Sequence, residues 1–410
     1  MSTNIQIESI IKKNVNDLLQ TTDIKGPGGV YFGKASVVFL LSNYYDYYKN
    51  QEILEKISDL ISDLFNNIST EKSYSLSGLS GLGFVMILLL KKGLLDRSDV
   101  EPYLHELNNV IIESLEQDVS LGNYDLMHGY IGKLVYLTEY LKYVNNNTLI
   151  LNKINESIHF FEDISTLDSR GNCFWKNNLK NNNKVCVGMA HGMPSIITFL
   201  ANLYESNLIF SNQERIKRLI KSGTNWLINH RNIVNNEVSS YYFPFIPADN
   251  NERKSYLAWC YGDLGVTFAF LKAGKVLKNS QLYSYGIEIG VNSAKKRLYN
   301  AGITSDDKRF DTSLCHGSFG IFFQFDLLFQ ETSNEIFKEA ALYWLKLNLN
   351  SAKPNYYFND YKVGSGLENN IKWEYDTSLL NGISGISLVL LSTIKKQRIP
   401  DLEKILLLNL

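Results

Sequence analysis

A short glycine pattern that returns along the whole chain is the feature that most constrains its fold. Each copy has a glycine, two further residues, a second glycine and then an apolar run. Five intact copies begin at Gly78, Gly129, Gly262, Gly317 and Gly382. Two degenerate copies add to them: Ser195 takes the second glycine position after Gly192, and Val30 takes the first position before Gly33. Repeats with spacings of this order are typical of folds in which each unit stacks on its neighbours.

The residues between the copies predict one pair of helices for each repeat. The run after each glycine pair is apolar on nearly all sides, which is typical of a helix buried all round. A stretch such as 53–61 instead has apolar residues at i, i+4, i+7 and i+8, which predicts an amphipathic helix. Glycines at the start of the inner helices allow neighbouring backbones to approach closely. A single copy would indicate only a helix cap, but seven copies predict an all-α repeat, with residues 1–410 as one domain.

Three polar or extended insertions interrupt this pattern, near residues 170–187, 235–256 and 351–374. The first has an Asn/Lys-rich centre between two apolar flanks, which is consistent with a hairpin. The second contains an aromatic and proline-containing run from Tyr241 to Pro247, and the third is rich in Gly and Asn. Long loops of this kind often cover or line a functional site. The run from Tyr241 to Pro247 is our candidate for a peptide-binding surface.

Charge and hydropathy exclude several classes of function. Lys plus Arg number 41 and Asp plus Glu number 42, so the chain lacks the basic footprint of a nucleic-acid-binding protein or of a protein held at an anionic membrane. The longest apolar run, 84–90, is far shorter than the ~20 residues that span a membrane, and no secretion signal opens the chain. We therefore expect a cytoplasmic protein whose four cysteines are thiols or metal ligands rather than disulfides.

Cysteine and histidine occupy matching positions in neighbouring repeats. Cys260 and Cys315 each lie two residues before the first glycine of their copy, and His316 and His191 each lie immediately before it. If the repeats form a ring, equivalent positions face the same central space. Two cysteines and one histidine are a ligand set that suits zinc (Zn2+). Three protein ligands leave one tetrahedral position open, as in catalytic zinc sites, and a substrate thiol bound there would be held as a thiolate.

The remaining cysteines and histidines have simpler interpretations. Cys173 and Cys186 are expected to be small buried core residues, although Cys186 and His191 by themselves would also be compatible with a metal pair. Three histidines show no relation to the repeat and are expected to be structural: His105, His159 and His230. His128 precedes the first glycine of the third copy, where it could line the central cavity.

The motifs Trp259-Cys260-Tyr261-Gly262, Cys315-His316-Gly317 and Ala190-His191-Gly192 resemble those of the lanthionine synthetase C-like family. The resemblance runs from about Val30 to Leu390. It implies an α,α-toroid, a double barrel of seven inner and seven outer helices. It also implies zinc on the two cysteines and His316, with His191 as an acid or base, Tyr261 in the site and Asp125 assisting proton transfer.

The resemblance also implies an activity and its partners. Stand-alone bacterial members join peptide cysteines to dehydroalanine or dehydrobutyrine, which makes lanthionine or methyllanthionine thioether rings. The expected substrate is a dehydrated precursor peptide with a leader and a core. Because the toroid takes up nearly all of the 410 residues, a separate dehydratase is expected. An exporter and a membrane-bound biosynthetic complex are further expected partners.

One residue departs from the family pattern, and two other functions stay open. Members often carry an arginine four residues before the first zinc cysteine, where this chain has Tyr256; Arg253 and Lys254 lie nearby but out of register. A contribution of that arginine to stabilising an enolate is therefore in doubt here. The same site would also serve a relative that adds glutathione to dehydroamino acids. The third interpretation is a zinc-containing scaffold that binds peptides.

Overall fold

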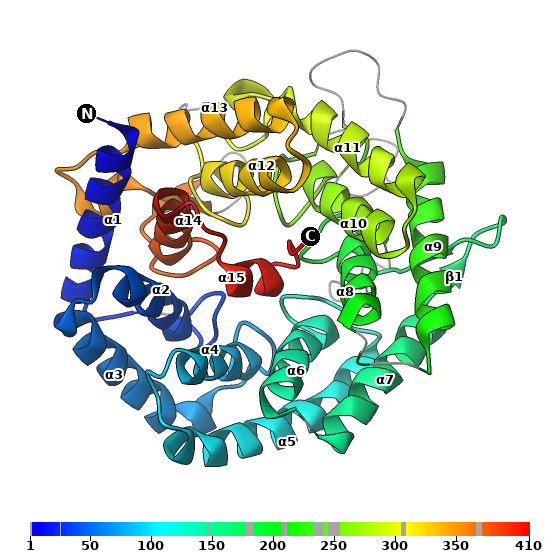
Figure 1. Ribbon diagram of the computed structural model, residues 1–410, viewed down its shortest axis with the longest axis horizontal. Coiled ribbons are helices and arrows are strands. Elements are labelled where there is room, and N and C mark those ends of the chain that lie inside the picture. The colour runs from blue at the N-terminus through cyan, green and yellow to red at the C-terminus, as the bar shows by residue number, and fades with distance from the viewer. Residues whose placement is uncertain are drawn as a thin grey trace.

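The structure is a computed structural model, and it describes residues 2–24, 26–145, 147–177, 184–206, 208, 211–232, 241–244, 255–304, 309–365 and 371–410. Two concentric rings of helices dominate it (Figure 1). The inner ring consists of α2 (Lys34–Tyr48), α4 (Leu79–Lys91), α6 (Tyr130–Val144), α8 (Met193–Ser206), α10 (Asp263–Val276), α12 (Ser318–Thr332) and α14 (Ile383–Lys395). The outer ring consists of α1 (Thr3–Gln20), α3 (Gln51–Asn66), α5 (Arg97–Leu121), α7 (Thr148–Asp163), α9 (Gln213–His230), α11 (Ser280–Ala294) and α13 (Glu335–Ser351). The predicted α,α-toroid is confirmed.

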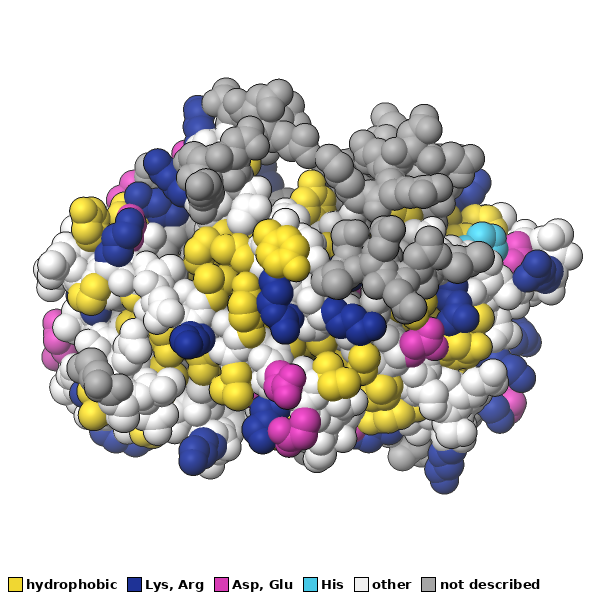
Figure 2. All heavy atoms as spheres, turned by 90° about the horizontal axis from the view of Figure 1, so that it is seen from above, with side chains coloured by type: hydrophobic (Ala, Val, Ile, Leu, Met, Phe, Trp, Pro, Cys, Tyr) yellow, Lys and Arg dark blue, Asp and Glu magenta, His cyan; other side chains and the backbone are white. Residues whose placement is uncertain are grey.

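The burial of each helix follows its sequence pattern. In α4 every side chain from Leu79 to Leu89 is buried, so this helix has neighbours on all sides. In α3 the five buried residues form one stripe (Ile53, Ile57, Leu60, Ile61 and Leu64), and the opposite face is exposed. Charged side chains of both signs lie dispersed over the outer edge of the ring on the side of α13 and α11 (Figure 2). The core therefore lies between the two rings and among the inner helices.

The N-terminal helix closes the ring. Each inner helix from α2 to α12 packs against the outer helix that follows it in the chain, whereas α14 packs against α1. Asn14 Nδ2 on α1 donates a hydrogen bond to Ser387 Oγ on α14 at 3.1 Å. Asn359 Nδ2, in the short helix η3 (Tyr357–Asp360), donates to Asn14 Oδ1 at 2.8 Å. Residues from both ends of the chain thus complete the seventh helix pair.

The structure corrects the register of the first repeat. Gly33, not Val30, is the residue immediately before α2, as Gly382 is before α14. A Cβ on Gly33 would lie 1.3 Å from Pro27 O, and one on Gly382 would lie 2.1 Å from Asp376 O, so the backbone six residues earlier leaves room only for glycine at both. Ser36 then takes the second glycine position, and its hydroxyl donates to Gly33 O.

The loops that precede the inner helices are joined by hydrogen bonds into a closed circle. The bonds run from Val30 N to Leu76 O (3.0 Å), from Ser77 Oγ to Met127 O (3.2 Å), from Leu126 N to Ala190 O (3.2 Å), from Met189 N to Trp259 O (3.2 Å), from Trp259 N to Cys315 O (3.1 Å), from Cys315 N to Leu380 O (2.9 Å) and from Leu380 N to Tyr31 O (3.1 Å). Every repeat contributes. This circle holds equivalent loop residues around one central space.

The C-terminal helix α15 (Pro400–Ile405) lies inside the ring rather than in either layer (Figure 1). The repeat pattern does not predict it. Leu402, Ile405 and Leu406 are at most 1% exposed. Trp259 Nε1 donates to Leu406 O at 2.8 Å, and the Tyr31 hydroxyl donates to Ile405 O. The segment therefore supports the circle of loops from within.

Short strands lie in two of the insertions. Strands β1 (Thr166–Leu167) and β2 (Cys173–Phe174) pair antiparallel, as do β3 (Val363–Ser365) and β4 (Lys372–Glu374). Asn177 and Lys184, at the two ends of the described residues that flank the Asn/Lys-rich stretch, form an isolated antiparallel bridge. Two short 3-10 helices complete the elements: η1 (Ile68–Thr70) and η2 (Leu298–Asn300). None of the described helices is long and apolar enough to cross a membrane.

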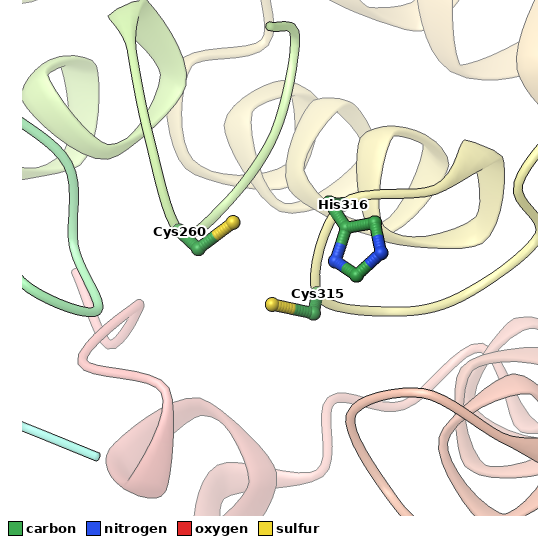
Figure 3. Close-up of side chains that lie close together, drawn as sticks. All are labelled: Cys260, Cys315 and His316. Atoms are coloured by element: carbon green, nitrogen blue, oxygen red, sulfur yellow. The ribbon is translucent and has the colours of Figure 1, made fainter. Parts of the chain in front are cut away.

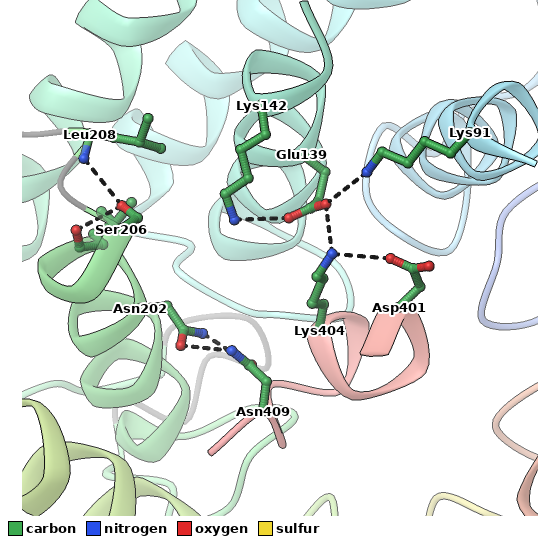
Figure 4. A network of polar contacts seen from close by, with 10 residues as sticks. Lys91, Glu139, Lys142, Asn202, Ser206, Leu208, Asp401, Lys404 and Asn409 are labelled. Carbon is green, nitrogen blue, oxygen red and sulfur yellow. Dashed lines mark hydrogen bonds and ion pairs between the residues drawn. The ribbon is translucent and has the colours of Figure 1, made fainter. Parts of the chain in front are cut away.

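A buried carboxylate gathers three lysines between α4, α6 and α15 (Figure 4). Glu139, with its side chain 5% exposed, contacts Lys91 at 3.3 Å, Lys142 at 3.0 Å and Lys404 at 3.0 Å. Burial acts to raise the pKa of Glu139, but the lysines outweigh it and lower that pKa to about 2. The network ties the C-terminal helix to the inner ring.

This network predicts acid-dependent stability. Because the pKa of Glu139 is lowered by folding, its contribution is complete above the unfolded value of 4.5 and is lost as the pH falls from 4.5 towards about 2. The shift corresponds to about 3 kcal/mol of unfolding free energy. Glu139→Gln should therefore lower stability at neutral pH and flatten its dependence between those pH values, as measured by urea unfolding. Glu101→Gln, which breaks an exposed ion pair with Arg97, is the control and should change little.

Candidate metal centre

Cys260, Cys315 and His316 come together at the circle of loops. One ligand atom from each lies within 4.8 Å of the other two. Cys260 lies in the loop before α10, while Cys315 and His316 lie in the loop before α12. Their sulfur atoms point towards each other, and one ring nitrogen of His316 faces the same gap (Figure 3). The two cysteines are 5% and 6% exposed. No other group of three such side chains is found in the part of the chain that the structure describes.

The two thiols and the imidazole lie close enough to shift one another's pKa values. Hydrogen bonding with Cys315 lowers the pKa of Cys260, and the same contact together with burial raises the pKa of Cys315. Burial acts to lower the pKa of His316, but Asp311 and Cys260 raise it to about 10. Cysteine and histidine bind metals in their deprotonated forms, so a divalent cation that entered this cluster would displace protons from the thiols and the imidazole.

Asp311 is a site residue that the repeat pattern did not reveal. Its Oδ2 atom lies 3.3 Å from His316 Nε2, so the other ring nitrogen, Nδ1, is left for a metal. Asp311 is 5% exposed and also accepts hydrogen bonds from the backbone N–H groups of Ser313 (2.7 Å) and Gly364 (2.9 Å). A carboxylate behind a ligand histidine fixes the orientation of its ring. Asp376 lies six residues before its glycine, as Asp311 does, so this spacing marks a repeat position and does not by itself single out Asp311 as a site residue.

Asp311→Asn is expected to weaken metal binding by roughly 10–100-fold. The single amide oxygen can replace only one of the two carboxylate oxygens, so the variant loses one of the backbone hydrogen bonds as well as the charged support of the histidine. Competition with a chromophoric chelator measures the affinity. Asp376→Asn is a matched control, since Asp376 Oδ1 accepts from Ser378 N at 2.6 Å in the same kind of turn. Equal metal affinity in both variants would contradict the role of Asp311.

His191 is held by Asp125 beside the cluster. His191 Nδ1 lies 2.7 Å from Asp125 Oδ2. Asp125 is fully buried, and its Oδ1 atom accepts from the backbone N–H groups of Met127 (2.8 Å) and His128 (2.9 Å). Burial acts to raise the pKa of Asp125, but His191 outweighs it, so this pKa is lowered. An ionised Asp125 that accepts from Nδ1 fixes the tautomer and the orientation of the His191 ring.

Aromatic rings lie next to one another on this side of the cluster. The ring centroids of His191 and Tyr261 are 5.5 Å apart, and those of His128 and His191 are 6.0 Å apart with nearly parallel planes. Burial raises the pKa of Tyr261, which keeps its hydroxyl protonated. All three residues immediately precede the first glycine of their repeats, as His316 does. The rings of His128, His191 and Tyr261, at equivalent positions of three repeats, therefore lie next to one another.

The other candidates lie elsewhere. Cys173 is buried and its thiol donates to Leu219 O at 3.7 Å, as expected for a core cysteine. His105 and His159 are exposed, and His230 stacks on Trp226 at 4.0 Å. Cys186 lies outside the three-residue cluster.

Two sequence features precede Cys260: Tyr256, and the insertion near residues 235–256. Tyr256, at the position of the family arginine, is 41% exposed, whereas Arg253 and Lys254 lie outside the described residues. In the second insertion only Tyr241 to Pro244 are described among residues 233–254. There the backbone N–H groups of Tyr242 and Phe243 donate to Asp263 at 3.1 and 2.9 Å. This part of the insertion is therefore anchored to the start of α10, and residues 245–247 lie outside the described residues, so the peptide-binding interpretation stays a prediction.

Comparisons with known proteins agree with this architecture. A family model described as lanthionine synthetase C-like protein matches residues 25–406. No curated protein matches the chain. Among solved structures, nisin cyclase is similar with a TM-score of 0.70 and 20% identity, over 99% of this chain and 98% of that one. A sugar epimerase from a ruminal bacterium reaches a TM-score of 0.46 at 13% identity, over 97% and 100% of the two chains, which is too distant to support an argument.

The likeness to nisin cyclase, at 20% identity, concerns the fold. The family match extends over nearly the whole chain and includes Cys260, Cys315 and His316. The chain belongs to the lanthionine synthetase C-like family.

Proposed function

We propose that this protein is a zinc-dependent lanthipeptide cyclase, with residues 1–410 acting as one domain. It would add peptide cysteine thiols to dehydroalanine or dehydrobutyrine and so form lanthionine or methyllanthionine rings. The observation that carries the proposal is the convergence of Cys260, Cys315 and His316 within 4.8 Å, in a chain that belongs to this family. The donor set fits zinc, because two sulfurs and one imidazole are soft ligands and Asp311 supports the histidine.

The chain's own residues can manage the protons of such a reaction. Bound zinc would hold a substrate thiol as a thiolate at neutral pH. In the addition, the sulfur bonds to the β-carbon of the dehydro residue and the α-carbon takes up a proton. His191, oriented by Asp125 at 2.7 Å, is the group we assign to that proton transfer. Tyr261, with its protonated hydroxyl beside His191, can hydrogen-bond to the substrate carbonyl.

The substrate defines the partners. A precursor peptide, with a leader and a core, must first lose water from its Ser or Thr residues, which requires a separate dehydratase. The product would need an exporter. We place the cyclase in the cytoplasm, where a membrane-bound complex with these partners would hold it at the membrane. Each partner is part of the proposal.

The direct test is ring formation in vitro. We expect the zinc-loaded protein to protect the cysteines of a dehydrated precursor peptide from alkylation without changing the mass of the peptide, because the addition is an isomerisation. Free thiols in the presence of folded, metal-loaded protein would contradict the proposal for that peptide. Adding glutathione to the same reaction distinguishes cyclisation from glutathione addition, because a glutathione adduct has a higher mass than the peptide. An unreactive peptide that stays bound would indicate a scaffold.

A further inference from the structure

A groove with a volume of about 470 Å³ lies beside the metal centre, outside the groups assigned to the reaction. We call it the β4 groove. It is formed by the end of α13, the segment 353–362 and β4. The side chains used below are Phe310, Thr312, Lys353, Asp360, Lys362 and Trp373. Its volume is in the range of clefts that bind ligands.

The groove combines positive charge with aromatic surface. Lys353 and Lys362 both contact Asp360, at 2.6 and 2.9 Å, so two ammonium groups share one carboxylate. Burial acts to raise the pKa of Asp360, but the two lysines lower it to about 2. The Lys353 side chain is 57% exposed and accessible from solvent. Trp373 and Phe310 supply apolar surface next to these cations.

One wall of the groove is connected directly to the metal centre. Phe310 and Thr312 line the groove, and Asp311 between them contacts His316. Thr312 Oγ1 donates to Lys362 O at 2.9 Å, and Gly364 N of β3 donates to Asp311 Oδ2 at 2.9 Å. Asp311, which lies between two groove residues in the sequence, therefore links this wall to a proposed metal ligand through its contact with His316.

The segment that carries Asp360 is held in one conformation. Phe358, Asn359 and Asp360 have φ values of 45°, 55° and 62°, a left-handed conformation that costs roughly 1–2 kcal/mol for each non-glycine residue. Contacts with α1 stabilise it, including the bond from Phe358 N to Asp17 Oδ2 at 2.8 Å. A surface ordered before binding loses less entropy when a ligand arrives.

We propose that the β4 groove binds the precursor peptide through a segment outside its ring-forming residues, one that carries carboxylates next to apolar or aromatic side chains. The inference rests on the proposed cyclase function. Carboxylates would pair with Lys353 and Lys362, and apolar side chains would pack on Trp373. A peptide anchored there would present successive cysteines to one metal centre at a high effective concentration.

Fluorescence anisotropy with synthetic probes tests this on the full-length, zinc-loaded protein. One short labelled peptide alternates Asp or Glu with Leu or Phe, and a matched peptide replaces the acids with Asn and Gln. The acidic peptide should bind more tightly, and salt should weaken it. Lys353→Glu and Trp373→Ala should each weaken it about tenfold. Lys338→Glu, which removes another exposed and paired lysine on α13, should leave the affinity unchanged.

The outcomes separate this proposal from the proposed function. Equal binding of the two peptides, or unchanged affinity in both groove variants, would overturn the groove. Thermal unfolding and zinc content of each variant show whether it is folded. A short dehydrated peptide with only the ring-forming residues should be cyclised equally by wild type and Lys353→Glu, whereas a substrate with an acidic flanking segment should show a raised KM in the variant. If wild type cyclises neither peptide, the cyclase function fails, whatever the binding result.

Discussion

Cys315→Ala should lose both metal and ring formation. The substitution removes one of three protein ligands from a cluster whose ligand atoms lie within 4.8 Å of one another. Structural zinc sites bind with roughly 10–16 kcal/mol, so one of four ligands accounts for about 3 kcal/mol, or at least ~100-fold in affinity. Without the metal a substrate thiol would stay protonated at neutral pH. Metal content after dialysis and alkylation of the peptide product measure the two effects.

Cys173→Ala is the matched control for this experiment. Cys173 is equally buried, but it lies on β2, away from the cluster. Its loss should cost some stability and leave zinc content and ring formation unchanged. Normal zinc content in Cys315→Ala would refute the ligand assignment, whatever the activity.

His191→Ala should separate proton transfer from metal binding. His191 is not among the three clustered residues, so zinc content should remain normal. The rate of ring formation should fall by roughly 10²–10⁴-fold, the range for loss of a general acid or base. Some products could have altered stereochemistry at the α-carbon, because water would then deliver the proton. Mass spectrometry with thiol alkylation gives the rate, and chiral analysis of hydrolysed product gives the configuration.

Two further variants sharpen this prediction. Asp125→Asn keeps the size of the residue but changes the group that accepts from His191 Nδ1, so it should lower the rate without changing metal content. His105→Ala removes an exposed histidine on α5 and should have no effect. An activity in His191→Ala equal to that in His105→Ala would remove His191 from the mechanism.

The sequence predicted the architecture because glycine has one physical role in every repeat. A Cβ at Gly33 or Gly382 would collide with the backbone six residues earlier, so the pattern had to recur at each inner helix. The same recurrence placed Cys260 and Cys315 at equivalent positions. The same pattern gives the wrong register for the first repeat. In the sequence Gly33 fits the second glycine position, whereas in the structure it takes the first position and Ser36 takes the second.

Other parts of the site could not be read from one-dimensional patterns. Asp311 was missed because an aspartate six residues before a glycine occurs in a repeat without a metal ligand as well, at Asp376. The position of α15 depends on long-range contacts, such as that of Trp259 with Leu406, which have no local periodicity. The β4 groove likewise joins residues from 309 to 373, which are separated in the sequence by the helices α12 and α13.

The closed circle of loop hydrogen bonds has a consequence for the order of folding during synthesis. Its last link, from Leu380 N to Tyr31 O, joins residues almost the whole chain apart, and closing such a long loop is entropically costly and slow. The first repeat therefore lacks its neighbour in the circle until the last repeat has left the ribosome. During that interval exposed apolar helices favour aggregation, so this chain should depend on chaperones more than its stability once folded would suggest.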